Sequence, residues 1–156
     1  MSHTTRPTVK AELDRLAIEF FRAVSFDEDG RPAYGNIFAL FIGSGLLIKN
    51  SGSVPEVSTL RQFIEPREAV VNAGELTSFL EEELWETTEI FGNVAHRFSA
   101  YSKRGVMNNA SFEAKGMIST QFILTPDGWR MSSMAWDDER AGLAVAHQNL
   151  RGSDTW

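Results

Sequence analysis

Apolar residues recur at helical spacing in the first part of the chain, while charged residues fall mostly on the other faces. The residues of the apolar face are Leu13, Leu16, Ala17, Phe20 and Val24. Thr8 stands just before this pattern, where its hydroxyl can accept a hydrogen bond from a free N–H of the first helical turn. The pattern predicts an amphipathic helix that begins after Thr8 and packs one face against a core.

Two shorter helical segments are predicted next. The apolar run 37–42 predicts a short buried helix, and 46–49 predicts a short strand. Ser58 or Thr59 is placed to cap a further helix, which we expect to be interrupted or restarted at Pro66. The first half of the chain is therefore predicted to be mainly helical.

The second half has the composition of β-strands, rich in β-branched, aromatic and apolar residues. Predicted strands cover 79–91, 94–103, 117–124 and 129–136. Pro126, Asp127 and Gly128 supply turn chemistry between the last two, which predicts a hairpin. Helices followed by meandering strands are typical of an α+β domain, in which helices cover one face of a curved, mostly antiparallel sheet.

Length and composition restrict the choices further. A chain of 156 residues that is 42% hydrophobic predicts one domain, which we place at 9–142 between a flexible N-terminus (1–8) and a C-terminal tail (143–156). The net charge of −6 and the lack of a basic cluster disfavour nucleic-acid binding. No apolar run has the length of a signal sequence or membrane span, and there is no cysteine. We expect no membrane contact, no metal, no cofactor and a cytoplasmic location.

The order of elements carries a family resemblance. The segment FGNVAHRFSAY followed by GMISTQFILTPDGWRMSSMAWDDER resembles the nuclear transport factor 2-like superfamily, and particularly its SnoaL-like branch of polyketide cyclases and ketosteroid isomerase-like proteins. The resemblance implies a cone: one long and two shorter helices close over a strongly bent sheet and leave a pocket inside. It also implies a homodimer, for which Trp85, Phe91 or Trp129 are candidate anchors.

His96 and Asp137 are the catalytic candidates. His96 shares one face of its strand with Phe98, among apolar residues, where a neutral imidazole can transfer a proton. Asp137 ends the last strand and can serve as a general base if it points inward, whereas its neighbour Asp138 points to the opposite face. Alternation alone leaves open which face lines the cone, and a half-buried histidine or a solvated ion pair explains the same residues without catalysis.

Five residues are candidates for ligand contact. Two are the tyrosines of the chain, two are aromatic residues of the strands, and one is an amide in an apolar strand: Tyr34, Tyr101, Phe98, Trp136 and Gln121. The aromatic side chains can form an apolar wall, and the hydroxyl and amide groups can orient a ligand by hydrogen bonds. The acidic run 81–83 is not expected to bind a metal, since strand alternation separates its middle residue from the other two and no histidine stands at ligand spacing. It is interpreted as a solvated edge.

These observations leave two functions open. The first is a domain that binds a small, mostly apolar organic molecule in the cone, since the interior is predicted to be aromatic while clear acid–base pairs are missing. The alternative is a lyase, isomerase or cyclase without a cofactor, which uses His96 or Asp137 for proton transfer and Tyr101 or Gln121 to polarise a carbonyl. The geometry of the cone decides between them.

Overall fold

The computed structural model describes residues 7–147, so residues 1–6 and 148–156 of the predicted flexible N-terminus and C-terminal tail lie outside the described part. Two α-helices, one 3-10 helix and six strands follow each other along this part. They are α1 (Val9–Val24), η1 (Tyr34–Ala39), β1 (Phe41–Lys49), β2 (Glu56–Thr59), α2 (Leu60–Asn72), β3 (Leu76–Phe91), β4 (Val94–Met107), β5 (Ala110–Thr125) and β6 (Gly128–Asp138).

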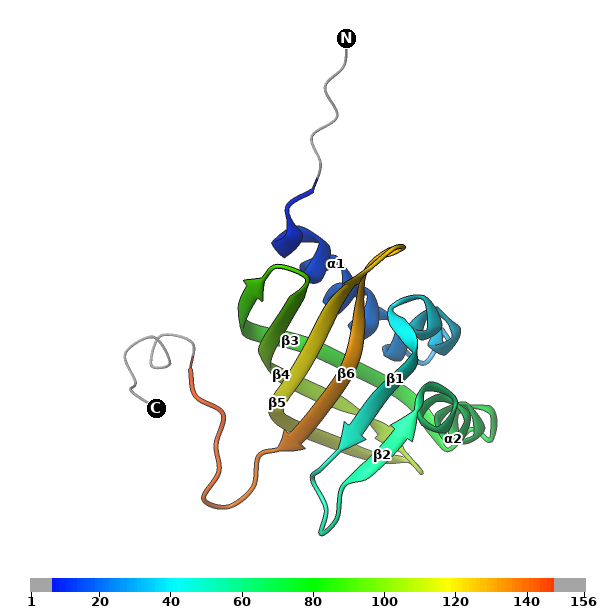
Figure 1. The fold of residues 1–156 in the computed structure, drawn as a ribbon. Helices are drawn as coiled ribbons and strands as arrows, with labels where there is room; N and C mark the ends of the chain where they lie inside the picture. The colour runs from blue at the N-terminus through cyan, green and yellow to red at the C-terminus, as the bar shows by residue number, and fades with distance from the viewer. Residues whose placement is uncertain (1–6, 148–156) are drawn as a thin grey trace.

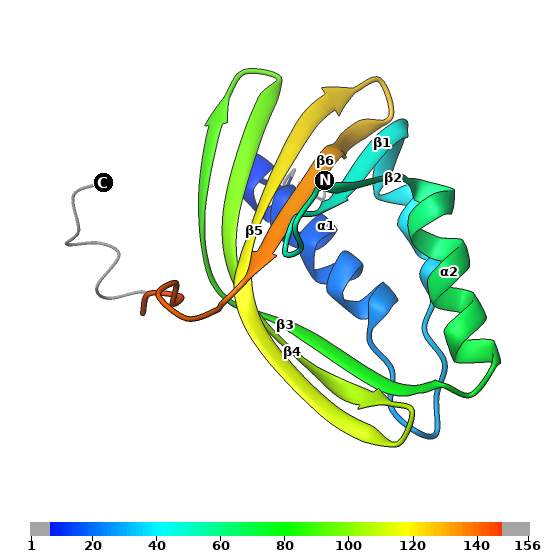
Figure 2. The same cartoon turned by 90° about the horizontal axis from the view of Figure 1, so that it is seen from below.

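The strands form one sheet in the order β2-β1-β6-β5-β4-β3. The β1–β6 pair is parallel and every other neighbouring pair is antiparallel. The long strands bend, so the sheet has a concave and a convex face, and the helices lie on the concave side (Figures 1 and 2). The predicted α+β cone is confirmed. The strand predicted at 46–49 is present, but it begins earlier, at Phe41, and a second strand that was not predicted, β2, precedes α2.

Several predicted boundaries are also corrected. The segment 37–42 is not a helix of its own, because the 3-10 helix ends at Ala39 and a strand begins at Phe41, where it pairs with Met131 of β6. Pairing with β6 thus decides the conformation of an apolar run that fits a helix equally well. The helix α2 runs through Pro66 without interruption, and Thr59 caps it in a capping box with Gln62.

Helix α1 lies along the inside of the cone (Figure 2). Its N-cap is Thr8, as predicted, and the Thr8 hydroxyl accepts a hydrogen bond from the Ala11 N–H at 3.1 Å. The predicted apolar face is buried, with Leu13 and Phe20 each at most 3% exposed. Burying each such side chain contributes about 1.5–3 kcal/mol, so this face fixes the helix on the sheet.

A buried arginine adds a polar connection between α1 and the sheet. Arg97 of β4 is 3% exposed and donates to both carboxylate oxygens of Glu83 at 2.7 and 3.0 Å and to Asp14 of α1 at 2.6 Å. Burial raises the pKa of the Asp14 carboxyl, but hydrogen bonds from Lys10 and Arg97 outweigh it and bring the pKa below its usual value. The arginine is therefore charged and fully paired, and it fills the inner end of the cone beneath the start of α1.

Two of the irregularities in strand pairing change which side chains of β3 and β6 face inward. Between Glu83 and Trp85 the β3–β4 pairing skips Leu84, and between Met131 and Ser133 the β5–β6 pairing skips Ser132. Each extra residue reverses the alternation of side chains beyond it. In β6 this turns Asp138 inward and Asp137 outward.

Close packing around Tyr101 leads to a prediction about Gly116. Tyr101 is completely buried on β4 and faces Gly116 of β5, where an added Cβ atom would overlap the Tyr101 hydroxyl and the Asp137 carbonyl oxygen. We expect Gly116→Ala to lower the free energy of unfolding by about 2 kcal/mol or more in urea titrations, because neither neighbour can retreat. The control is Gly43→Ala, where a Cβ atom meets nothing within 4 Å; equal effects of the two substitutions would contradict this packing.

Candidate ligand-binding pocket

A cavity of about 200 Å³ lies inside the cone, between the concave face of the sheet and the three helices. Most of its wall is apolar, with aromatic rings from both layers: Phe20, Phe63, Phe79, Phe112 and Trp136. A cavity of about 150 Å³ is large enough to bind a benzene ring, so this one accommodates a ring with small substituents. The helices and the bent sheet thus enclose space that their own side chains do not fill.

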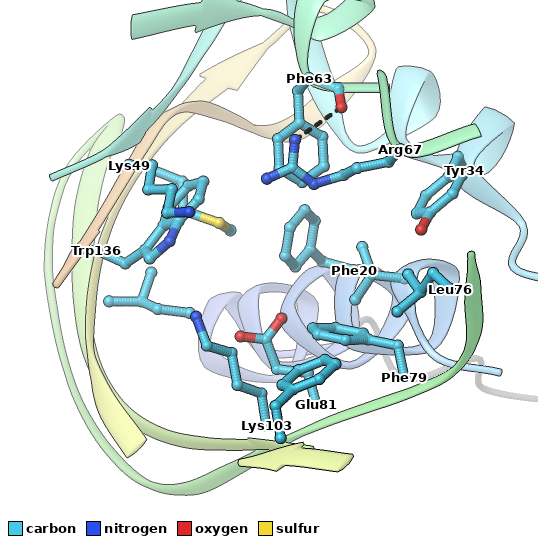
Figure 3. A pocket seen from close by; sticks show the side chains of 14 residues that line it. Phe20, Tyr34, Lys49, Phe63, Arg67, Leu76, Phe79, Glu81, Lys103 and Trp136 are labelled. Carbon is cyan, nitrogen blue, oxygen red and sulfur yellow. Dashed lines mark hydrogen bonds between the residues drawn. The ribbon is translucent and has the colours of Figure 1, made fainter. Parts of the chain in front are cut away.

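Glu81 of β3 is the acidic group of this cavity. Its side chain points into the cavity beside Phe79 and Lys103 (Figure 3). Within residues 7–147, no group donates a hydrogen bond to its carboxylate, and no cation approaches within ion-pair distance. Burial raises the pKa of the Glu81 carboxyl to about 7, although Lys103 and Arg67 act in the opposite direction. Glu81 therefore exchanges a proton with its surroundings at neutral pH.

Arg67 of α2 is the main cationic group. Its guanidinium lies over the Phe63 ring, 3.7 Å from the centroid, and one nitrogen donates to the Phe63 carbonyl oxygen at 2.9 Å (Figure 3). Burial lowers the pKa of Arg67, and the attraction of Tyr34 and Glu81 offsets part of that effect. The other guanidinium N–H groups have no acceptor among the described residues. They are available to a ligand.

Tyr34 adds a hydroxyl at the entry to η1. The residue is 4% exposed, lines the cavity, and its hydroxyl has no hydrogen-bond partner in the described part of the chain (Figure 3). Burial raises the pKa of Tyr34, so the hydroxyl is neutral and can donate. A buried hydroxyl without a partner is uncommon in proteins and indicates a bound water or ligand.

A paired lysine completes the polar side of the pocket. Lys103 Nζ lies 3.0 Å from Asp138 Oδ1, and the Tyr101 hydroxyl donates to the same carboxylate. Burial and this hydrogen bond raise the pKa of Tyr101 well above its usual range. Tyr101 and Asp138 thus form a fixed support for Lys103, which lines the cavity beside Glu81 on the neighbouring strand.

The structure separates the sequence-predicted residues into two groups. Tyr34 and Trp136 line the cavity, and Tyr101 lies directly behind its wall. His96 lies on the convex face with its side chain 59% exposed, and its Nε2 is 2.9 Å from Glu89 Oε1. The histidine of the predicted catalytic pair is therefore on the opposite face of the sheet from the cavity.

The remaining predicted residues also lie on the convex face. Asp137 forms an ion pair with Arg140 at 2.7 Å. Asp137 and Phe98 also line a hollow on the convex face, which residues 143–145 border as well. Gln121 accepts a hydrogen bond from the Ser133 hydroxyl at 3.4 Å. His96 and Asp137 do not converge, because the odd-numbered residues of β4 point inward and the irregularity at Ser132 turns Asp137 outward.

Sequence reasoning missed the charged residues of the pocket, including Glu81, Arg67 and Lys103. Glu81 was assigned to a solvated acidic edge, although it shares strand parity with Phe79, which is a signal for the inner face. Arg67 follows Phe63 by one helical turn and therefore lies on the apolar face of α2. Lys103 shares strand parity with Tyr101, an aromatic residue of the inner face. In each case the charged side chain suggested an exposed position, whereas its apolar neighbours on the same face indicate burial.

Comparison with solved structures identifies the fold. The chain is similar to a nuclear transport factor 2-like superfamily protein from Salmonella enterica serovar Typhimurium (TM-score 0.69, 15% identity, 89% of this chain and 97% of that chain covered). It is also similar to LinA (TM-score 0.67, 12% identity, 88% and 93% covered) and to a protein of the same superfamily from Cytophaga hutchinsonii (TM-score 0.64, 13% identity, 86% and 100% covered). The protein has the nuclear transport factor 2-like fold.

Other comparisons give no further relatives. No protein-family model matches the sequence, and no curated protein matches it. Within residues 7–147, no group of three or more histidine or acidic side chains is placed to hold a metal ion. None of the helices in the same range is long and apolar enough to cross a membrane.

The raised pKa of Glu81 predicts how stability depends on pH. The pKa of the Glu81 carboxyl is 4.5 in the unfolded chain and about 7 in the folded protein. The contribution of this group to stability is fully present below pH 4.5, where both states are protonated. It is lost as the pH rises from 4.5 through about 7, because the unfolded chain releases the proton more readily than the folded protein does. The loss amounts to about 3 kcal/mol. In urea titrations, Glu81→Gln is therefore expected to gain stability relative to the unmodified protein between about pH 4 and 8.

The matched control for this prediction is Glu82→Gln, at the adjacent exposed position of the same strand. It is expected to leave the pH dependence of unfolding unchanged. A pH profile of Glu81→Gln that runs parallel to that of the unmodified protein would show that Glu81 is not desolvated.

Proposed function

We propose that this protein binds a small, mostly apolar organic molecule inside the cone. The observation that carries the proposal is a partly open aromatic cavity into which Glu81, Arg67 and Tyr34 direct polar groups that have no hydrogen-bond or ion-pair partner among residues 7–147. A buried polar group without a partner costs about 1–3 kcal/mol. Tyr34 is buried, and Arg67 and Glu81 are half-buried, so these groups need water or a ligand as a partner.

The size and composition of the cavity support the choice of ligand. About 200 Å³ admits a single substituted ring, and Phe20, Phe63 and Trp136 offer flat apolar surfaces to it. Ligand sites commonly combine such a wall with a few polar groups that fix orientation. The ligand is therefore an apolar body with one or two polar groups that face Glu81 and Arg67.

A second candidate function is proton-transfer catalysis at the same site. Glu81 is favoured as the general base because its pKa of about 7 suits proton exchange at neutral pH and its carboxylate is free of hydrogen bonds from residues 7–147. Lys103 lies beside it on the neighbouring strand, where a cation stabilises negative charge developing on a carbonyl oxygen. The reaction type remains that of a lyase, isomerase or cyclase, with Glu81 in the role first considered for His96 or Asp137.

We further propose a cytoplasmic homodimer, related to the SnoaL-like branch, in which the convex face of the sheet is the contact surface. Phe91 supports this assignment, because it is 86% exposed at the β3–β4 turn. The other two anchors considered do not: Trp129 is buried in the core, and the Trp85 indole donates to the Ala146 carbonyl oxygen at 2.9 Å.

Native mass spectrometry tests ligand and dimer together. We expect the freshly purified protein to have twice the 17.4 kDa mass of the chain, with an additional small mass that is released on denaturation. Filling the cavity by Ile118→Trp is expected to abolish the additional mass without dissociating the dimer, because Ile118 lines the inner wall only. If the Trp variant carries the same small molecule, the ligand is not in the cone.

Hydrogen–deuterium exchange of a small ketone tests the catalytic candidate. With cyclohexanone in D₂O, the unmodified protein is expected to accelerate exchange beside the carbonyl, increasingly as the pH rises through about 7, because Glu81 must be ionised to accept the proton. Glu81→Gln is expected to lower this rate by about 100-fold. Equal rates for the unmodified protein, Glu81→Gln and Glu82→Gln would exclude Glu81 as the base.

A further inference from the structure

The charges of the cavity differ in sign from those of the whole chain. The protein carries a net charge of −6, yet the groups that line the cavity are three cations, Lys49, Arg67 and Lys103, and one carboxylate, Glu81. Asp138 neutralises Lys103 at 3.0 Å, whereas Arg67 has no carboxylate within ion-pair distance in the described structure. The cavity therefore has an unpaired, partly desolvated cation in an otherwise acidic protein.

Hydrogen-bond donors also outnumber acceptors at this end of the cavity. Arg67 uses one nitrogen for the Phe63 carbonyl oxygen and leaves the rest of its planar fork free. Tyr34, which is 4% exposed, contributes a neutral hydroxyl without a partner among residues 7–147. A planar anion with two acceptor oxygens matches these donors better than a neutral polar group does.

We propose that the ligand of the cone is a small organic carboxylate whose carboxylate group binds Arg67 while its apolar body lies among the aromatic side chains. This inference rests on the proposed binding function and specifies the chemical class of its ligand. A phosphate group fits less well, because it needs more donors than one arginine fork and a hydroxyl provide. The apolar wall accounts for the rest of the molecule.

Binding of a carboxylate is coupled to a proton on Glu81. The charged or titratable groups near Glu81 in the described structure come from five elements, while α1 contributes the apolar Phe20 and Val24: Arg67 from α2, Lys103 and Tyr101 from β4, Asp138 from β6, Lys49 from β1 and Tyr34 from η1. An anion added to this set raises the pKa of Glu81 above its value of about 7 in the free protein. The complex then holds a proton that the free protein has lost, and protonated Glu81 becomes a further donor.

The sign of the pH dependence follows from this coupling. Below about pH 7 the free protein already has Glu81 protonated, so affinity for the carboxylate is constant there. Above it, each further pH unit lowers the affinity by up to about ten-fold, because a proton must be taken up on binding. Glu81→Gln imitates the protonated form and is expected to bind with an affinity that does not change over this range.

The test compares benzoate with benzamide, which has the same ring and nearly the same shape but no charge. In calorimetric titrations at about pH 6.5, we expect the unmodified protein to bind benzoate roughly ten- to one-hundred-fold more tightly than benzamide. Arg67→Met keeps much of the side-chain stem, and it is expected to abolish this preference while changing the benzamide affinity by less than about two-fold.

The matched control is Arg61→Met, which removes the same charge from the same helix at a side chain that is 78% exposed. It is expected to retain the preference for benzoate. A preference that survives in Arg67→Met, or equal affinities of the two ligands for the unmodified protein, would overturn the carboxylate assignment while leaving the binding function in place. Failure of both ligands to bind at millimolar concentration would contradict the binding function itself.

A second measurement does not use Arg67→Met, so it applies even if that variant does not fold. Benzoate titrations at about pH 8 in two buffers of different ionisation enthalpy are expected to reveal uptake of up to one proton per ligand. Glu81→Gln is expected to show none. A binding heat that is independent of the buffer would overturn the proposed coupling.

Discussion

The bend of the long strands is the constraint on which the rest of the structure depends. β3, β4 and β5 are 14 to 16 residues long, and a flat sheet of that length could not be covered by α1 and α2 on one side. Bending makes the covered face concave, and the residues skipped in pairing at Leu84 and Ser132 are local features of the kind that bend strands. At the α2 end, the side chains of the sheet and the helices do not fill the space between the two layers, and the cavity is the space that remains.

Buried and half-buried charged side chains are arranged differently at the two ends of the cone. At the start of α1, Arg97 is enclosed by carboxylates from α1 and β3, so that charge is neutralised within the protein. At the α2 end, Arg67 and Glu81 face the same cavity, and neither has an ion-pair partner within residues 7–147. Stability alone favours paired charges, as at Arg97. The arrangement of Arg67 and Glu81 is consistent with a ligand that supplies their missing partners.

The sequence predicts the architecture much better than the pocket. Helical spacing from Leu13 to Val24 and the turn at Pro126 to Gly128 are local signals, and both are confirmed. The strand 94–103 is longer than predicted because Asn108 and Asn109 form its turn with positive φ angles, a role that asparagine tolerates. The pocket depends on strand parity, and one skipped residue at Ser132 exchanges Asp137 for Asp138. Such irregularities follow from pairing across the sheet and have no local signature in the sequence.

Glu81 lies in a partly desolvated pocket inside the cone, and both proposed functions depend on this environment. Carbon-13 NMR of the glutamate side-chain carboxyl groups, with the Glu81 signal assigned by its absence in Glu81→Gln, measures this directly. We expect the Glu81 signal to titrate with a midpoint near pH 7. A midpoint near 4.5, the usual value for a solvated glutamate, would contradict it.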